Sequence, residues 1–119
     1  MTSAYLIDPL ARTITIVERG DKTSLSPVYA LLHCRGVERY ALGGGDLLYV
    51  DEQPPAGGGA FVCHLYPDTS FIGRALWIGS SAEGEEADPD VSLDIAAESI
   101  VFVSGDFLNE SPVDDRSAA

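Results

Sequence analysis

Residues 4–18 read AYLIDPLARTITIVE, and this stretch decides the fold class. Its two ends, AYLID (4–8) and RTITIVE (12–18), are rich in β-branched and aromatic residues, which favour extended strands. Asp8-Pro9 between them is typical of a tight turn, because proline presets φ and aspartate can bond the backbone ahead of it. The stretch therefore predicts a β-hairpin with one face toward a core and the other half exposed.

Downstream segments add a short helix and further strands. Ser26-Pro27 supplies an N-cap and a first-turn proline, Gly36 supplies a stop, and Arg35 falls in the last turn, so this segment predicts a helix of about nine residues. Residues 92–98 predict one or two helical turns. The nearly continuous apolar run at 100–104 predicts a strand interior to the sheet. Other strands are expected at 37–42, 47–50, 60–66 and 74–78.

The fold class that follows is α+β, with a mostly antiparallel sheet of five to seven strands and one or two short helices on one face. The chain has 119 residues, of which 45% are apolar and 22% charged, as expected for one folded domain. We assign residues 1–109 to that domain and residues 110–119 to a frayed acidic C-terminal tail. The sequence has no apolar run long enough for a membrane span and no signal-like N-terminus, so a cytoplasmic protein is expected.

The formal net charge is −12, and it is unevenly distributed. Eleven of the 19 acidic residues fall within residues 83–119, together with one of the seven basic residues. Because a single local cation cannot pair eleven carboxylates, we expect solvated loops and an outward face. This segment is interpreted either as a solubilising surface or as an anionic surface for a cationic partner. Its candidate contact residues are Glu83, Glu85, Glu86, Asp88 and Asp90.

Three stretches carry a family resemblance: AYLIDPLARTIT at 4–15, LYVDE at 48–52 and GRALWIG at 73–79. The chain resembles a group of small uncharacterised proteins of phages and proteobacteria, which open with a similar hairpin followed by a short helix. The resemblance implies an accessory protein of phage or mobile-element type. It implies no activity, ligand or functional residue.

Two cysteines and two histidines, His33, Cys34, Cys63 and His64, match the inventory of a zinc site but not its spacing. Adjacent residues in a strand face opposite sides of the sheet, so each pair offers at most one ligand. We therefore expect neither a metal site nor a cofactor. The alternative is a small-molecule or metal-binding domain with these four residues around one pocket, which their convergence in space would support.

Catalytic motifs are missing from the sequence. No Gly-x-Ser-x-Gly turn is present, and neither glycine triplet is followed by the Lys-Ser/Thr of a phosphate-binding loop. The expected function is therefore non-catalytic: contact with a protein partner, or self-association. The acidic balance argues against direct nucleic-acid binding, and no membrane contact is expected. A sharper alternative is an inhibitor of a nucleic-acid-binding protein, whose carboxylates would imitate a phosphate row if residues 83–90 were extended.

Overall fold

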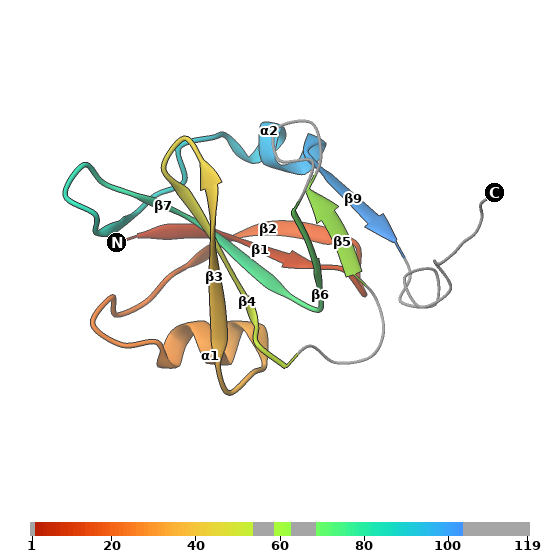
Figure 1. Ribbon diagram of the computed structural model, residues 1–119, viewed down its shortest axis with the longest axis horizontal. Helices are drawn as coiled ribbons and strands as arrows, with labels where there is room; N and C mark the ends of the chain where they lie inside the picture. Colours follow the sequence, from red (N-terminus) through yellow and green to blue (C-terminus); the bar gives the residue numbers. More distant parts are fainter. Residues whose placement is uncertain (1, 54–58, 63–68, 104–119) are drawn as a thin grey trace.

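The computed structural model describes residues 2–53, 59–62 and 69–103 (Figure 1). Nine strands and two helices lie in these residues. In chain order they are β1 (Ser3–Asp8), β2 (Thr13–Glu18), α1 (Ser26–Leu32), β3 (Val37–Gly43), β4 (Asp46–Asp51), β5 (Gly59–Val62), β6 (Thr69–Ile72), β7 (Ala75–Ser80), β8 (Glu86–Ala87), α2 (Leu93–Glu98) and β9 (Ile100–Val103).

The strands form two sheets, and every pairing between them is antiparallel. The larger sheet has six strands in the order β2-β1-β7-β4-β3, with β8 added alongside the end of β7. The smaller sheet has the order β6-β5-β9. A mostly antiparallel architecture with two short helices confirms the predicted α+β class.

A cluster of buried residues covers each face of the larger sheet. Side chains along a strand alternate between the two faces, so neighbouring residues of one strand belong to different clusters. On β7, Trp77 faces one cluster of buried residues, which includes α2 and the smaller sheet. Its neighbours Leu76 and Ile78 face a second cluster, closed by Val28 and Leu32 of α1. The two helices thus lie on opposite faces of the large sheet, whereas the sequence predicted helices on one face.

The central strand of the large sheet is β7, and its residues Ala75 to Ile78 are completely buried. A strand that is buried on both faces needs a continuous apolar run rather than an alternating one. The prediction that residues 100–104 form an interior strand is wrong. β9 lies at the edge of the smaller sheet, where Val101 is 48% exposed.

The local signals around α1 are displaced from the prediction. The N-cap residue is Leu25 rather than Ser26, and the Ser24 hydroxyl accepts a 3.0 Å hydrogen bond from the Ser26 amide. The helix ends at Leu32, so Arg35 lies beyond its last turn. His33, not Gly36, adopts the left-handed conformation that ends the helix, with φ of 56°. Non-glycine residues take this conformation uncommonly, which explains why the sequence favoured Gly36.

The hairpin predicted at residues 4–18 is confirmed, since β1 pairs with β2, and the strands expected at 37–42 and 47–50 pair as β3 and β4 across Gly44-Gly45. β5 supplies the first part of the strand predicted at 60–66, and residues 63–66 lie outside the described residues. The predicted tail at 110–119 also lies outside them. None of the described helices is long and apolar enough to cross a membrane.

Candidate functional site

The acidic residues predicted to contact a partner, at 83–90, do not share one role. Glu83 and Glu85 are exposed at a turn between β7 and β8, closed by hydrogen bonds from Ser81 N to Glu85 O (2.7 Å) and from Gly84 N to Ser81 O (2.9 Å). Gly84 has φ of +85°, which glycine adopts without strain. We call residues 83–90 the acid-rich turn. Residues 81–85 form a tight turn rather than an extended segment. Glu83 and Glu85 therefore do not form the extended row of carboxylates that imitation of phosphates requires.

Glu86 is tied inward. Its carboxylate forms an ion pair with Arg19, whose side chain is 1% exposed, and accepts a 2.6 Å hydrogen bond from the Tyr49 hydroxyl. The Lys22 ammonium donates to the Glu86 carbonyl oxygen at 3.0 Å. Burial raises the pKa of Glu86, but the hydrogen bonds from Arg19 and Tyr49 and the nearby positive charges leave it below its ordinary value. The prediction that the whole segment is solvated and outward is therefore wrong at Glu86.

Asp88 and Asp90 also help to attach the acid-rich turn to the sheet. The Asp88 carboxylate accepts a 2.7 Å hydrogen bond from the Ser3 amide. The Asp90 amide donates to the buried Asp46 carboxylate at 2.9 Å, and the other oxygen of Asp46 accepts from Trp77 Nε1 at 2.8 Å. A side chain at Gly79 would collide with the Asp88 carbonyl oxygen, so glycine is required where the backbone of the acid-rich turn packs closely against β7. Within the described residues, the carboxylates of Glu83, Glu85 and Asp90 remain exposed and make no ion pair, because Asp90 contributes only its backbone amide.

His33 and Cys34 lie at the C-terminal end of α1, while Cys63 and His64 lie outside the described residues. Among the residues that the structure describes, no group of three or more His, Cys, Asp or Glu side chains is arranged to hold a metal ion. Burial, followed by the charge of Asp51, raises the pKa of the Cys34 thiol. A thiol with a raised pKa is a poor nucleophile near neutral pH.

Three hollows meet at Asp51, the last residue of β4. The largest, of about 560 Å³, lies between the β1–β2 turn, the end of α1 and Arg74. A second, of about 270 Å³, lies between β3 and β6, and a third, of about 170 Å³, lies beside His33 and Cys34. We call this region the Asp51 surface; its acidic residues are Asp8, Glu38, Asp51 and Glu52.

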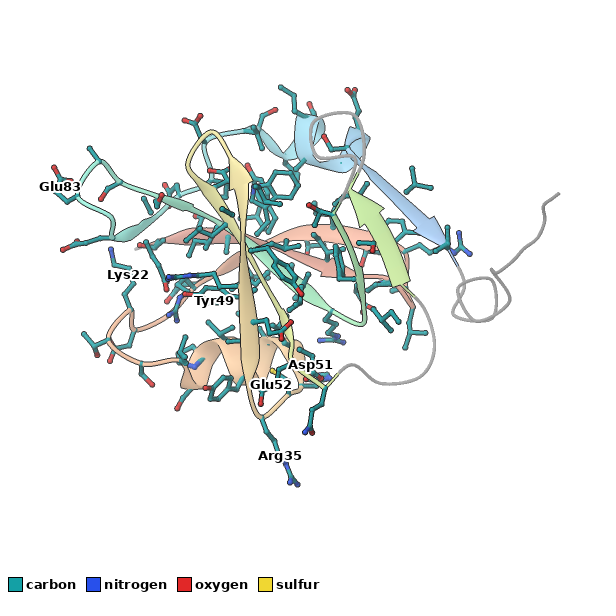
Figure 2. The ribbon with its side chains drawn as sticks, viewed as in Figure 1. Lys22, Arg35, Tyr49, Asp51, Glu52 and Glu83 are labelled. Atoms are coloured by element: carbon teal, nitrogen blue, oxygen red, sulfur yellow. The ribbon has the colours of Figure 1, made fainter. Side chains whose placement is uncertain are left out.

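Arg74 neutralises only part of this surface. Its guanidinium lies 3.4 Å from the Asp8 carboxylate, donates to the Leu31 carbonyl at 3.1 Å and lies 3.3 Å from His33 Nε2. The Asp51 carboxylate accepts a hydrogen bond from the Gln53 amide at 2.9 Å. Figure 2 shows Asp51 and Glu52 together at the end of β4, with Arg35 pointing outward and away from them.

No ion pair within the described ranges includes Glu38, Asp51 or Glu52. These three carboxylates therefore leave the Asp51 surface electronegative. The apolar walls of its hollows come from residues such as Leu10, Leu32, Val50 and Phe71.

Sequence reasoning missed this surface because its acids are far apart along the chain. Asp8, Glu38 and Asp51 come from three different strands, and only the register of the sheet brings their strand ends into one region. One available signal was the pair Asp51-Glu52, which directly follows the apolar run of β4 and precedes Gln53-Pro54-Pro55. Polar residues at the end of a buried strand are favourably placed for binding.

Comparison with known proteins adds one relative. The chain is 27% identical over 95 residues to the uncharacterised protein y4iR of Sinorhizobium fredii (strain NBRC 101917 / NGR234), and the match covers 79% of this chain. It spans 59% of the length of that relative. No family model matches the chain, and no solved structure matches it. The similarity to an uncharacterised protein is consistent with the resemblance drawn above, while the phage-type origin stays a prediction.

Proposed function

We propose that this protein is a non-catalytic binding protein that contacts a cationic segment of a partner protein through the Asp51 surface. The observation that supports this most is that one carboxylate without an ion-pair partner in the described chain, Asp51, borders three hollows. Lysine and arginine side chains combine an aliphatic stem with a charged head, and they bury the stem along apolar walls while the head meets a carboxylate. The hollows offer both features.

The charge of the whole chain supports the same class of partner. With a net charge of −12, the protein attracts basic molecules over distances comparable to the Debye length, about 8 Å at physiological salt. Compared with the acid-rich turn, the Asp51 surface is the better contact region, because its hollows can take side chains beside its carboxylates. The acid-rich turn offers the exposed carboxylates of Glu83, Glu85 and Asp90, which attract a cation through charge alone.

The experiment uses a blocked peptide of alternating lysine and threonine, (Lys-Thr)4, with affinity measured by calorimetry or fluorescence anisotropy. Asp51→Asn should weaken binding about tenfold, because it removes a half-buried charge from the contact. The double variant Glu83→Gln/Glu85→Gln removes more charge from the acid-rich turn and should change affinity less than about twofold.

Salt dependence provides a second measure. Affinity for the peptide should fall steeply between low and physiological ionic strength, and less steeply for Asp51→Asn. If the peptide does not bind, or if the acid-rich double variant loses more affinity than Asp51→Asn, the Asp51 surface is not the contact site.

A further inference from the structure

We infer that the partner segment binds as an added strand along the free edge of β3, with alternate basic side chains entering two neighbouring hollows on its Glu38–Tyr40 face. This inference rests on the proposed function and specifies its geometry. Strand addition takes affinity from main-chain hydrogen bonds and specificity from pockets for alternate side chains. The structure offers a free edge, and beside it two hollows in line.

The free edge follows from the register of the large sheet. β3 is the terminal strand, paired with β4 on one side, and the described chain places no strand on the other. The Glu52 amide donates to the Gly36 carbonyl at 3.1 Å, which makes these two a hydrogen-bonded pair in the same register as β3 and β4. Hydrogen-bonded pairs alternate along an antiparallel ladder. The amides and carbonyls of Val37, Arg39 and Ala41 therefore point away from β4, toward an incoming strand.

Two hollows lie along this edge, on the face that carries Glu38 and Tyr40. The first, of about 270 Å³, has Glu38 and Tyr40 on one side and Phe71 of β6 on the other. The second, of about 390 Å³, is lined by Tyr40, Ala41, Thr69 and Ser70. Side chains two positions apart in a strand are separated by about 6.5 to 7 Å and share a face. Glu38 and Tyr40 are two positions apart and lie beside the two hollows. On a strand added next to β3, two side chains with the same spacing therefore lie opposite these hollows and can enter them.

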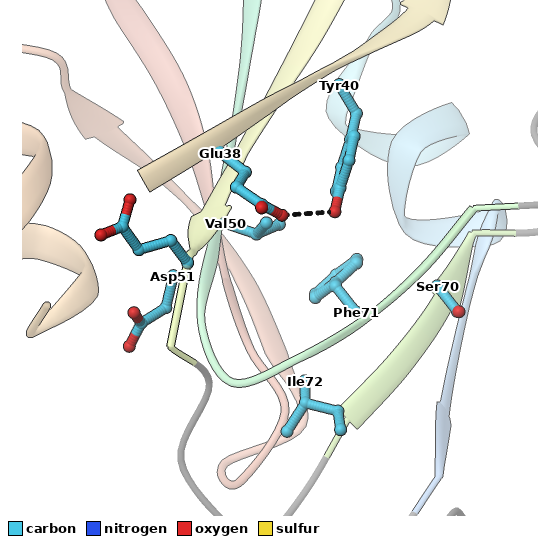
Figure 3. Close-up of a pocket in the computed structure, with 8 residues that line it drawn as sticks. Glu38, Tyr40, Val50, Asp51, Ser70, Phe71 and Ile72 are labelled. Atoms are coloured by element: carbon cyan, nitrogen blue, oxygen red, sulfur yellow. Dashed lines mark hydrogen bonds between the residues drawn. The ribbon is translucent and has the colours of Figure 1, made fainter. Parts of the chain in front are cut away.

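The chemistry of the first hollow selects a cation. Figure 3 shows the Glu38 carboxylate and the Tyr40 hydroxyl pointing toward the space in front of Phe71, joined by a hydrogen bond of 2.8 Å. That hydrogen bond raises the pKa of Tyr40, so the phenol stays neutral near pH 7 and Glu38 supplies the charge. The residues that line this hollow include three acids and no base. A lysine or arginine head can pair with Glu38 while its stem lies against Val50 and Phe71.

A second copy of this chain is a poorer occupant. Two copies that each carry a net charge of −12 repel one another as their edges approach. A basic segment removes that repulsion. We therefore commit to an extended, lysine- or arginine-containing segment of a different protein.

The test compares the (Lys-Thr)4 peptide with two N-methylated forms, one methylated at every lysine amide and one at every threonine amide. In an added strand, only alternate amides donate to the edge, so one form should lose at least about tenfold in affinity and the other should stay within about twofold. The set that matters reports whether the strand runs antiparallel or parallel to β3. This comparison uses the unaltered protein, so folding of variants does not enter.

A protein variant gives an independent measure. Arg39→Pro removes an outward amide without breaking the β3–β4 ladder, as edge strands allow, and should reduce affinity about tenfold relative to the matched variant Arg39→Ala. Equal binding of all three peptides and of both Arg39 variants, with binding still lost in Asp51→Asn, would overturn strand addition and leave the proposed function intact. Failure of every peptide to bind contradicts the proposed function itself. A dimer that Arg39→Pro dissociates would show that a second copy, not a basic partner, occupies the edge.

Discussion

The acid-rich turn and the Asp51 surface are both rich in carboxylates, yet the fold uses them in opposite ways. In the acid-rich turn the acids are adjacent in sequence, and three of the five residues make hydrogen bonds that hold β8 and its flanks to the sheet: Glu86, Asp88 and, through its amide, Asp90. At the Asp51 surface the acids are scattered in sequence, and Glu38, Asp51 and Glu52 have no ion-pair partner in the described chain.

This difference shows that a segment with many acidic residues close together in sequence is not necessarily the region whose carboxylates are available to a partner. A buried cation such as Arg19 requires a carboxylate as its counter-ion. Glu86 fills this role, so its carboxylate stabilises the fold and is not available to a partner. Glu38, Asp51 and Glu52 face no such buried cation within the described chain. The following changes separate the two uses, beginning with the largest expected effect.

Glu86→Gln should lower the free energy of unfolding by about 3 kcal/mol, because it leaves the buried Arg19 guanidinium without a counter-ion. Urea denaturation followed by Trp77 fluorescence measures the change. Glu85→Gln, one residue away and exposed, is the matched control and should stay within about 0.5 kcal/mol. Equal effects of the two variants would contradict the division between structural and free acids.

The same pair gives a pH dependence. Since the pKa of Glu86 is lower in the folded protein than its ordinary 4.5, its contribution to stability is fully present above that value and is lost as pH falls through the folded-state pKa. The unfolding free energy of the unaltered protein should therefore fall more on acidification than that of Glu86→Gln. Parallel pH profiles of the two proteins would show that folding does not lower the pKa of Glu86.

Asp46→Ala should cost about 2 kcal/mol, because it removes the acceptor shared by the Trp77 indole and the Asp90 amide inside the core. Thermal denaturation and the Trp77 emission maximum report the change. Asp90→Ala keeps the Asp90 amide and serves as the control, with an expected effect within about 0.5 kcal/mol. A large effect of Asp90→Ala would mean that its exposed carboxylate has a structural role that the fold does not show.

Tyr49→Phe should cost about 1 kcal/mol, since it deletes one hydrogen bond to the Glu86 carboxylate and leaves the packing of the ring in place. Tyr40→Phe also removes a hydroxyl that donates to a glutamate, but at the exposed Asp51 surface, and should cost less than about 0.5 kcal/mol. Chemical denaturation compares the two. The opposite order would place the more important tyrosine at the free surface.

Asp51→Asn has the smallest expected effect on stability, within about 0.5 kcal/mol, because asparagine retains an oxygen that can accept from the Gln53 amide. Its effect should appear in the affinity for the basic peptide instead. If Asp51→Asn destabilises the protein as much as Glu86→Gln, then Asp51 is a structural acid as well, and the contrast between the two regions fails.

The sequence predicted what depends on neighbours along the chain. The hairpin at residues 4–18 follows from Asp8-Pro9 between two strand-like segments, and both are local features. The partner of Glu86 could not be predicted in this way, since Arg19 lies 67 residues earlier. The left-handed His33 and the edge position of β9 likewise depend on tertiary packing. The Asp51 surface required the strand register, which brings together the ends of β1, β3 and β4.

The position of β7 has a consequence for how the chain folds during synthesis. The β1–β2 and β3–β4 hairpins are made first, but in the large sheet they contact each other only through β7, which enters between them. Until residues 75–80 have left the ribosome, each hairpin exposes an inner edge that later becomes fully paired. Nascent chains halted before Ala75 should therefore depend on chaperones, because the unpaired edges of β1 and β4 are both exposed and can pair with other chains.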